Sequence, residues 1–212
     1  MQSDFQELEL VESQGGGGGE PSAKRMRAKK LYIHDEIWSD LSVLVVDIKN
    51  FTATCSILSA GRAGDWTQTF YDCFFRLCDV YQMMFLEKRG DCCICSSQGN
   101  VKCLLQMAVD LHYNLTKTHT LRMGVATGDI QVLLGENFFS VGGSTVQRAD
   151  SLQSQTKPGF LLMDKPSTIK WSKEEDKPRP KTFILGNELN GVVEYDLESG
   201  TFVPPRSNSL TF

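Results

Sequence analysis

The stretch Leu41–Thr52, LSVLVVDIKNFT, limits what this chain can fold into more than any other part of the sequence. It contains an uninterrupted apolar run, Val43–Val46, of mostly β-branched residues, which is typical of a strand buried on both faces. The run ends on Asp47, and Asn50–Thr52 then indicate a loop that opens into a helix. A carboxylate at the end of a buried strand is costly without a partner, and a bound cation is a common solution. The N–H groups of the following turn are free to face an anion, so one short segment offers a hard-cation ligand next to a place for a phosphate.

Length and charge indicate an ordinary globular protein. The 212 residues suffice for one domain with a full core, and a formal net charge of −4 gives no general attraction to nucleic acid or anionic lipid. No apolar run approaches the roughly 18 residues that a membrane span needs, and the acidic N-terminus lacks the apolar core of a signal peptide. Seven cysteines without framework spacing indicate free thiols. A reducing, cytoplasmic location is therefore expected.

The first 30 residues are expected to be a disordered tail in front of a folded domain at residues 31–197. Gly15–Gly19 is a run of five glycines and predicts a flexible linker. The basic run Lys24–Lys30, KRMRAKK, is interpreted as a solvated flank of this tail, with a nuclear address or a contact for anionic lipid as alternatives. Residues 198–212 are expected to form a loose C-terminal tail.

Hydrophobic periodicity predicts the other elements of the domain. Helices are predicted at residues 53–58, from an N-cap at Asp65 to the low eighties, and at residues 104–115, 144–154 and 165–171. Strands are predicted at residues 85–88, 92–96, 121–126, 130–134, 160–163, 182–185 and 191–197, with tight turns at 89–91 and 127–129. Because hairpins mix with helices, the expected fold is an α+β sandwich, with helices on one face of a mainly antiparallel sheet.

Two aspartates are the first candidates for chemistry. Asp47 ends the first strand and Asp91 lies at the tip of a predicted hairpin, so both carboxylates can reach one point. Two aspartates facing one site suggest Mg²⁺ or Mn²⁺ bound also by substrate phosphates. The alternative is that each aspartate only caps a turn. A thiolate metal site at Cys92–Cys95 with Cys103 is a weaker candidate, since alternating thiols on a strand are usually part of a core.

Four segments together resemble one known family. DIKNFT, EKRGDCCIC, LRMGVATGDI and GGSTVQRADSLQS resemble motifs of the class III nucleotide cyclases, the adenylyl and guanylyl cyclases, and they occur in the same order with similar gaps over residues 41–165. The resemblance implies a ferredoxin-like, cyclase-type sandwich. It also implies the conversion of a purine nucleoside triphosphate to the 3′,5′-cyclic nucleotide and pyrophosphate by two-metal catalysis, in intracellular signalling.

The resemblance also implies roles for individual residues of the metal and phosphate site. Asp47 and Asp91 would bind the two divalent metals, and the backbone carbonyl of Ile48 would be a further ligand. Backbone N–H groups would meet the phosphates at Asn50, Phe51 and Thr52.

Base choice in the resembled family depends on two positions, which are Glu87 and Ser140 here. A carboxylate at the first accepts hydrogen bonds from guanine N1–H and N2–H₂, so the pair favours GTP over ATP. The alternative for Glu87 is an ion pair with Lys88 or Arg89, or a solvated strand residue.

The chain departs from the family pattern on one helix. Gln147 and Ser151 stand where the family has an asparagine that binds the ribose and an arginine that stabilises the transition state. Gln147 can still donate to an oxygen, whereas a serine cannot replace a guanidinium. Two alternatives remain for Arg148, which are a contact with the phosphates from a different angle and a solvated position on the helix. The phosphate-binding lysine of the family also lacks a clear counterpart among Asn187, Asn190 and Lys181.

Sites of the resembled family form between two chains, so the resemblance implies a dimer. A homodimer would lack the arginine in both sites, whereas a heterodimer with an intact cyclase domain would hold one complete site. The alternative function is a catalytically impaired, cyclase-like pseudoenzyme that binds nucleotide or a partner cyclase and regulates signalling.

Overall fold

The computed structural model describes residues 6–7, 32–135, 138–175, 183–185 and 189–203. The predicted glycine linker and basic run lie outside these residues. No helix within the described ranges is long and apolar enough to cross a membrane.

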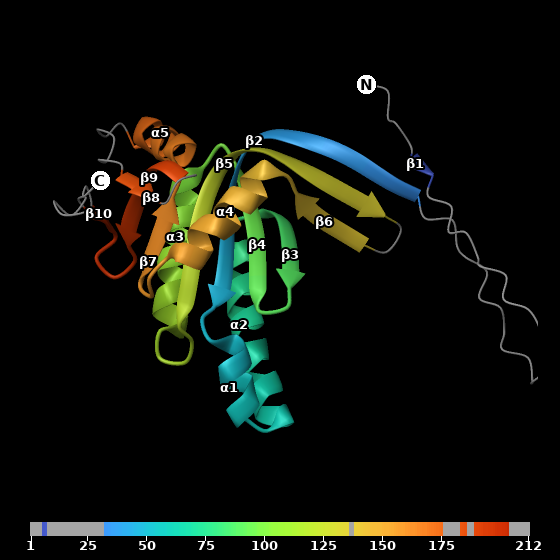
Figure 1. Ribbon diagram of the computed structural model, residues 1–212, viewed down its shortest axis with the longest axis vertical. Coiled ribbons are helices and arrows are strands. Elements are labelled where there is room, and N and C mark those ends of the chain that lie inside the picture. The colour runs from blue at the N-terminus through green and yellow to red at the C-terminus, as the bar shows by residue number, and fades with distance from the viewer. Residues whose placement is uncertain (1–5, 8–31, 136–137, 176–182, 186–188, 204–212) are drawn as a thin grey trace, which may run out of the picture.

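A large, mainly antiparallel sheet forms the centre of the fold (Figure 1). Its strands follow the order β10-β9-β7-β5-β2-β4-β3, while β1 pairs with β2, β6 with β5, and β8 with β9. Among the described strands, β5 and β7 are parallel and every other pair is antiparallel. The strands are β1 (Gln6–Glu7), β2 (Tyr32–Ile48), β3 (Met84–Arg89), β4 (Cys92–Gln98), β5 (Leu121–Gly135), β6 (Phe138–Gly142), β7 (Phe160–Met163), β8 (Phe183–Leu185), β9 (Leu189–Asp196) and β10 (Thr201–Val203).

Helices cover both faces of this sheet. Figure 1 shows α4 in front of the strands and α2 and α3 behind them. The sandwich predicted from the sequence is confirmed, but the expectation that helices occupy one face is wrong, because α4 packs on the face opposite α2 and α3. The helices are α1 (Phe51–Ile57), α2 (Ala60–Val80), α3 (Val101–Leu115), α4 (Ser144–Gln155) and α5 (Lys165–Glu174).

Strand β2 is buried on both faces, as its apolar run predicts. Leu44, Val46 and Ile48 point into a core shared with α2 and α3, whereas Val43 and Val45 point into a second core shared with α4. Each of the five is at most 1% exposed, and full burial of such a side chain stabilises the fold by about 1.5–3 kcal/mol. This central strand carries Asp47 at its end.

Two glycines of β5 allow α4 to lie directly on the sheet. A Cβ atom at Gly124 would lie 2.2 Å from the carbonyl oxygen of Ala149 and 2.5 Å from the backbone nitrogen of Gln153. At Gly128 it would lie 2.7 Å from Oγ1 of Thr145. The lack of a side chain at these two positions therefore permits the close approach of α4 to the sheet.

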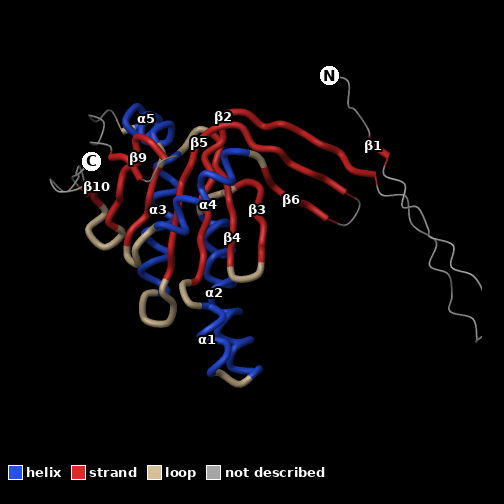
Figure 2. Tube along the Cα trace, in the orientation of Figure 1, coloured by secondary structure: helices blue, strands red, loops and turns tan. Residues whose placement is uncertain are grey.

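The hairpin predicted around residues 127–129 is wrong, because β5 continues straight through this segment. Gly128 pairs with β2, and the hydroxyl of Thr127 lies 2.8 Å from those of both Ser42 and Ser167. These contacts hold the backbone extended where the residue types favour a turn. Beyond this point β2 and β5 run on together with β6 as an arm that leaves the rest of the sheet (Figure 2).

The first long helix begins earlier than Asp65. Ser59 is its N-cap, and the N–H of Ala63 already donates to the carbonyl of Ser59 at 2.8 Å. Gly61 and Gly64, in the first two turns, therefore do not prevent helix formation, and Asp65 lies inside α2. The expected buried face is present, with Phe70 and Phe74 fully buried.

Three strands occur where irregular chain was predicted. β6 lies between the predicted strand at residues 130–134 and the predicted helix at 144–154, where no element was predicted, and β1 lies within the expected N-terminal tail. β10 lies within the expected C-terminal tail, where the ring of Phe202 packs against Trp171 at 4.5 Å and Tyr195 at 4.9 Å between centroids. An aromatic anchor thus extends the folded domain beyond residue 197.

Candidate active site

The end of β2 and the tip of the β3–β4 hairpin bring Asp47 and Asp91 together. Asp47 pairs across the sheet with Cys92, the residue that follows Asp91. The backbone N–H of Ile48 donates to the carbonyl oxygen of Asp91 at 3.3 Å. The two carboxylates predicted to share a site therefore lie at one corner of the sheet.

Arg122 supplies positive charge at this corner. It lies opposite Asp47 in the β2–β5 register, and its Nε and Nη2 both donate to Oδ2 of Asp47, with an Nε–Oδ2 distance of 3.1 Å. Burial raises the pKa of Asp47, the guanidinium of Arg122 opposes the rise, and the negative charges of Asp91 and Asp150 add to it. Burial and the nearby carboxylates raise the pKa of Asp47 by more than Arg122 lowers it. A second cation beside Asp47 would therefore stabilise its ionised form.

The turn that carries Asp91 is fastened to α2. The hydroxyl of Tyr71 donates to the carbonyl oxygen of Gly90, and the ammonium of Lys88 lies 3.5 Å from the centroid of the Tyr71 ring. Gly90 itself has a φ of 60°, which a side chain would strain. Tyr71 therefore fixes the backbone beside Asp91.

The residues predicted to face phosphates form the start of α1. Asn50 precedes the helix with a φ of 61°, and its carbonyl accepts the first helical hydrogen bond, from Thr54 at 2.9 Å. The N–H groups of Phe51 and Thr52 therefore have no partner within the helix. The ring of Phe51 stacks on Trp66 with centroids 5.9 Å apart, which anchors α1 to α2.

The donor atoms at this corner suit a hard divalent cation. Carboxylate oxygens of Asp47 and Asp91 and the carbonyl of Ile48 are the ligand types that Mg²⁺ and Mn²⁺ prefer. The described residues contain no cluster of three or more histidine, cysteine, aspartate or glutamate side chains arranged for a metal. The protein would therefore supply few ligands and leave positions for substrate oxygens and water, as Mg²⁺ sites on phosphate substrates do.

The thiols next to this corner do not form a second metal site. Cys93 and Cys95 are fully buried in the core with α2 and α3. Burial raises the pKa of Cys92 to about 12 and raises the pKa of Cys93 further. The CCIC segment thus holds protonated core thiols, and Cys103 lies on α3 as a free cysteine.

The two residues predicted to choose the base lie side by side. Oγ of Ser140 lies 3.2 Å from Oε1 of Glu87, and the backbone N–H of Val141 donates to Oε2 of Glu87 at 2.7 Å. Arg89 also binds Glu87, through Nε at 2.7 Å and Nη2 at 2.9 Å. The alternative of an ion pair between Glu87 and Arg89 is therefore present in the structure.

The exposed face of α4 carries no positive charge near the expected catalytic positions. Gln147, Asp150 and Ser151 are all exposed. Asp150 is close enough to Asp47 and Arg89 for its charge to affect the pKa of both. At these three positions the face presents an amide, a carboxylate and a hydroxyl group to a partner.

Arg148 does not fill the place of the missing arginine, and its predicted approach to the phosphates has no support here. Its Nε lies 3.3 Å from Oδ2 of Asp164, and its Nη2 donates to the carbonyl of Thr127 at 2.9 Å. Thr127 lies about 16 Å further along β5 than Arg122. Arg148 thus pairs with a buried aspartate away from the corner of Asp47.

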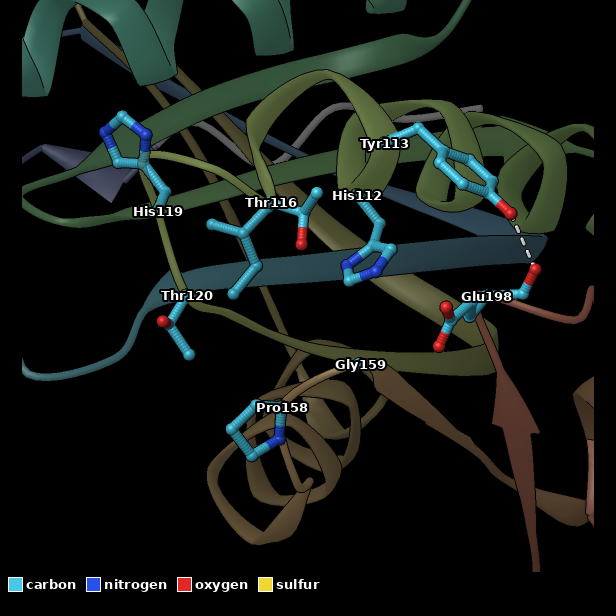
Figure 3. Close-up of a pocket in the computed structure, with 9 residues that line it drawn as sticks. His112, Tyr113, Thr116, His119, Thr120, Pro158, Gly159 and Glu198 are labelled. Carbon is cyan, nitrogen blue, oxygen red and sulfur yellow. Dashed lines mark hydrogen bonds between the residues drawn. The ribbon is translucent and has the colours of Figure 1, made fainter.

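The surface of the described residues includes two cavities of similar volume. One, of about 300 Å³, lies between the sheet and the start of α4 and is lined by residues that include Arg89, Val141, Gln147 and Asp150. The other, of about 320 Å³, lies at the end of α3 among His112, Tyr113 and Glu198, and contains none of the predicted site residues (Figure 3). The first cavity is therefore the one that adjoins the candidate site.

Sequence reasoning missed three residues of this site, whereas Arg89 was named as a possible partner of Glu87. Arg122 lies in a quoted motif, but its place opposite Asp47 follows from the strand register. Tyr71 and Asp150 approach the site only in the folded structure, which no local pattern reveals. Lys181 and Asn187 lie outside the described residues, and Asn190 lies in β9.

Comparisons with known proteins bear on the family and the fold. The family described as the adenylate and guanylate cyclase catalytic domain matches residues 33–181. A search of curated proteins found no match.

Solved cyclase structures share the fold. The guanylate cyclase domain of RhGC from Catenaria anguillulae, in complex with GTP, has a TM-score of 0.66 at 14% identity, covering 81% of this chain and 100% of that one. The adenylyl cyclase CyaB from P. aeruginosa has a TM-score of 0.62 at 17% identity, covering 82% and 98%. The dimeric guanylyl cyclase domain of RhoGC from Blastocladiella emersonii has a TM-score of 0.62 at 17% identity, covering 76% and 95%.

Proposed function

The chain belongs to the adenylate and guanylate cyclase catalytic domain family, and we propose that it converts a purine nucleoside triphosphate into the 3′,5′-cyclic nucleotide and pyrophosphate. One observation carries the proposal. Asp47 and Asp91 meet at a sheet corner that also holds Arg122 and the start of α1. This corner combines hard-cation ligands, an arginine paired with one of them and free backbone N–H groups, which are the kinds of group that phosphoryl transfer needs.

The reaction joins two atoms of one substrate. A bond forms between the ribose 3′ oxygen and the α-phosphorus, the bond from the α-phosphorus to the bridging oxygen breaks, and pyrophosphate leaves while the 3′ proton passes to solvent. Arg122 is placed to offset negative charge on the triphosphate. The N–H groups of Phe51 and Thr52, next to Asn50, would hold phosphate oxygens in line.

Mg²⁺ or Mn²⁺ is the proposed cofactor. Asp47, Asp91 and the carbonyl of Ile48 would hold it, and the repulsion that raises the pKa of Asp47 would be relieved by its charge. When bound, such an ion supplies Lewis-acid activation of the 3′-hydroxyl and neutralises phosphate charge.

GTP is the favoured substrate and ATP the alternative. Glu87 and Ser140 adjoin one another, so a base that reaches one meets the other. A carboxylate accepts from the N1–H and N2–H₂ groups of guanine, which adenine lacks in this arrangement.

The second half of the site is proposed to come from another cyclase domain. Gln147 and Ser151 leave the two expected catalytic positions of α4 without a guanidinium, and the absence of a transition-state arginine costs about 10³-fold or more in phosphoryl transfer. A homodimer is therefore expected to turn over slowly. A heterodimer with an arginine-bearing partner would place that arginine opposite the Asp47 corner of this chain.

A second candidate function is a regulatory pseudoenzyme that binds nucleotide without turnover. Its support is the engagement of Arg148 with Asp164, which leaves α4 without a substitute cation on its exposed face.

Product analysis separates these functions. Purified protein is incubated with each of the four nucleoside triphosphates and Mn²⁺, alone and mixed with an intact cyclase domain, and products are identified by mass spectrometry. Cyclic GMP that disappears with Asp47→Ala supports the cyclase. Mn²⁺-dependent thermal stabilisation by GTP without product supports the pseudoenzyme, and the absence of both product and stabilisation rejects the two together.

A further inference from the structure

Arg89 occupies the place at which Glu87 would meet a base. Its Nε donates to Oε1 of Glu87 at 2.7 Å, and its Nη2 donates to Oε2 at 2.9 Å. This is the two-pronged contact between a planar N–C–N donor unit and a carboxylate. Guanine presents the same unit through N1–H and the 2-amino group, so the guanidinium of Arg89 imitates the edge of guanine.

The carboxylate of Glu87 has no acceptor capacity left over. Besides the two bonds from Arg89, Oε1 lies 3.2 Å from the hydroxyl of Ser140, and Oε2 accepts from the N–H of Val141 at 2.7 Å. A carboxylate offers about four lone-pair sites, and four donors already use them. A base cannot pair with Glu87 until Arg89 leaves.

Arg89 also holds the two sides of the base region together. Its Nη2 donates to the carbonyl of Val141 and lies 3.5 Å from the hydroxyl of Ser140, which links β3 to β6. Beside this contact the ring of Phe85 stacks on that of Phe139 with centroids 5.9 Å apart. The polar contact and the aromatic pair both join β3, at the edge of the sheet, to β6 in the arm.

Exposure shows which of the two partners can move. The side chain of Glu87 is 12% exposed, whereas that of Arg89 is 42% exposed and lies at the last position of β3, next to the turn. Arg89 covers Glu87 from the solvent side and lines the adjoining cavity of about 300 Å³. Outward rotation of this one side chain would uncover the carboxylate.

We infer that Arg89 is an internal plug that occupies the purine-edge position at Glu87 and must be displaced before a guanine base binds. The inference rests on the proposed function, because it assigns a nucleotide base to this position. Wild-type protein therefore binds nucleotide chiefly through its triphosphate, and its preference for GTP over ATP is weak. Removal of the plug increases affinity and creates a preference for guanine.

The test measures affinity without turnover. Calorimetry with Mn²⁺ compares 3′-deoxy forms of GTP, ITP and ATP, which lack the attacking hydroxyl, on wild type, Arg89→Ala and Arg89→Lys. Because plugged molecules do not bind the base, Arg89→Ala should bind the GTP analogue about tenfold tighter than wild type, in the order GTP over ITP over ATP. Arg89→Lys keeps a positive charge but lacks the planar pair of N–H donors, so its affinity for the GTP analogue should lie between those of wild type and Arg89→Ala.

Two controls connect the effect to Glu87. Arg62 is an exposed arginine of α2, so Arg62→Ala removes the same charge and should leave affinity and base order unchanged. Glu87→Ala in the Arg89→Ala background should abolish the preference for guanine.

The outcomes separate the plug from the proposed function. The plug alone is overturned if wild type and Arg89→Ala bind the analogues with Mn²⁺ at the same strength and in the same base order. It is also overturned if wild type already shows a strong preference for guanine that depends on Glu87. If neither protein binds any analogue or inorganic tripolyphosphate with Mn²⁺, the plug and the proposed function both fail.

Discussion

Asp47 in β2 lies directly opposite Arg122 in β5, and both Nε and Nη2 of the arginine donate to Oδ2 of the aspartate. The pairing places a cation beside the carboxylate of Asp47. Burial and the negative charges of Asp91 and Asp150 disfavour the ionised form of that carboxylate. A corner of this kind is less stable than it would be with neutral groups, and a bound metal removes the conflict.

Asp47→Asn is expected to raise the melting temperature at neutral pH. Since the folded state raises the pKa of Asp47 above 3.8, the folded state binds more protons than the unfolded state just above that pH. Stability from this group is full below about pH 3.8 and is lost as pH rises through the folded-state pKa. Melting curves with and without Mn²⁺ check this, and Mn²⁺ should stabilise wild type but not the variant.

A matched control for that experiment is Asp65→Asn, which removes an exposed carboxylate of α2. It should leave the response to Mn²⁺ intact. Equal stabilisation of wild type and Asp47→Asn by Mn²⁺ would show that the metal binds elsewhere.

Arg148→Ala is expected to act on stability and not on nucleotide binding. Its removal leaves Asp164 buried with hydrogen bonds from Ser167 but without a cation, which should cost about 1–3 kcal/mol of unfolding free energy. Urea unfolding and nucleotide calorimetry measure the two effects separately. Unchanged stability together with weakened nucleotide binding would return Arg148 to a role at the phosphates.

Gly124→Ala is expected to be severely destabilising, by more than about 3 kcal/mol, because the new Cβ would meet the backbone of α4 at 2.2 Å. Gly61→Ala is the matched comparison, since its Cβ meets nothing within 4 Å and the residue lies in a helix. That change should stabilise the protein by about 0.5–1 kcal/mol. Similar losses from both changes in chemical denaturation would contradict the close packing of α4 on β5.

Protonation of His119 is expected to destabilise the fold in mild acid. The ring is buried, stacks on Trp66 at 4.6 Å, and burial lowers its pKa below 6.5. The unfolded state therefore binds a proton more readily, so stability is full above about pH 6.5 and falls as pH drops toward the folded-state pKa. Unfolding free energies between pH 5 and 7 should show this slope in wild type and not in His119→Phe.

The sequence predicted the centre of the fold better than its edges. The apolar run before Asp47 marks a strand buried on both faces, and the periodic face of α2 is buried as expected, because both patterns report burial directly. The turn predicted at residues 127–129 failed because pairing with β2 and contacts from Ser42 and Ser167 hold that segment extended. Local turn chemistry cannot foresee such tertiary contacts.

The candidate site likewise contains residues that the sequence predicted and residues that it did not predict. Asp47 and Asp91 meet as strand-end and hairpin-tip positions suggested, and Glu87 lies beside Ser140. The pairing of Arg89 with Glu87 was one of two alternatives that the sequence offered, whereas the pairing of Arg122 with Asp47 follows from strand register, which a single sequence does not display.

If the Asp47 corner supplies the metal and phosphate half of a cyclase site, an arginine restored to the other half should increase turnover. The measurement is the rate of cyclic nucleotide formation by the double variant Gln147→Asn, Ser151→Arg with Mn²⁺ and GTP, with ATP in parallel. A rise of about 10³-fold or more over wild type is expected, together with loss of that activity when Asp47→Ala is added. A double variant that forms no cyclic nucleotide, or one whose product persists without Asp47, would contradict it.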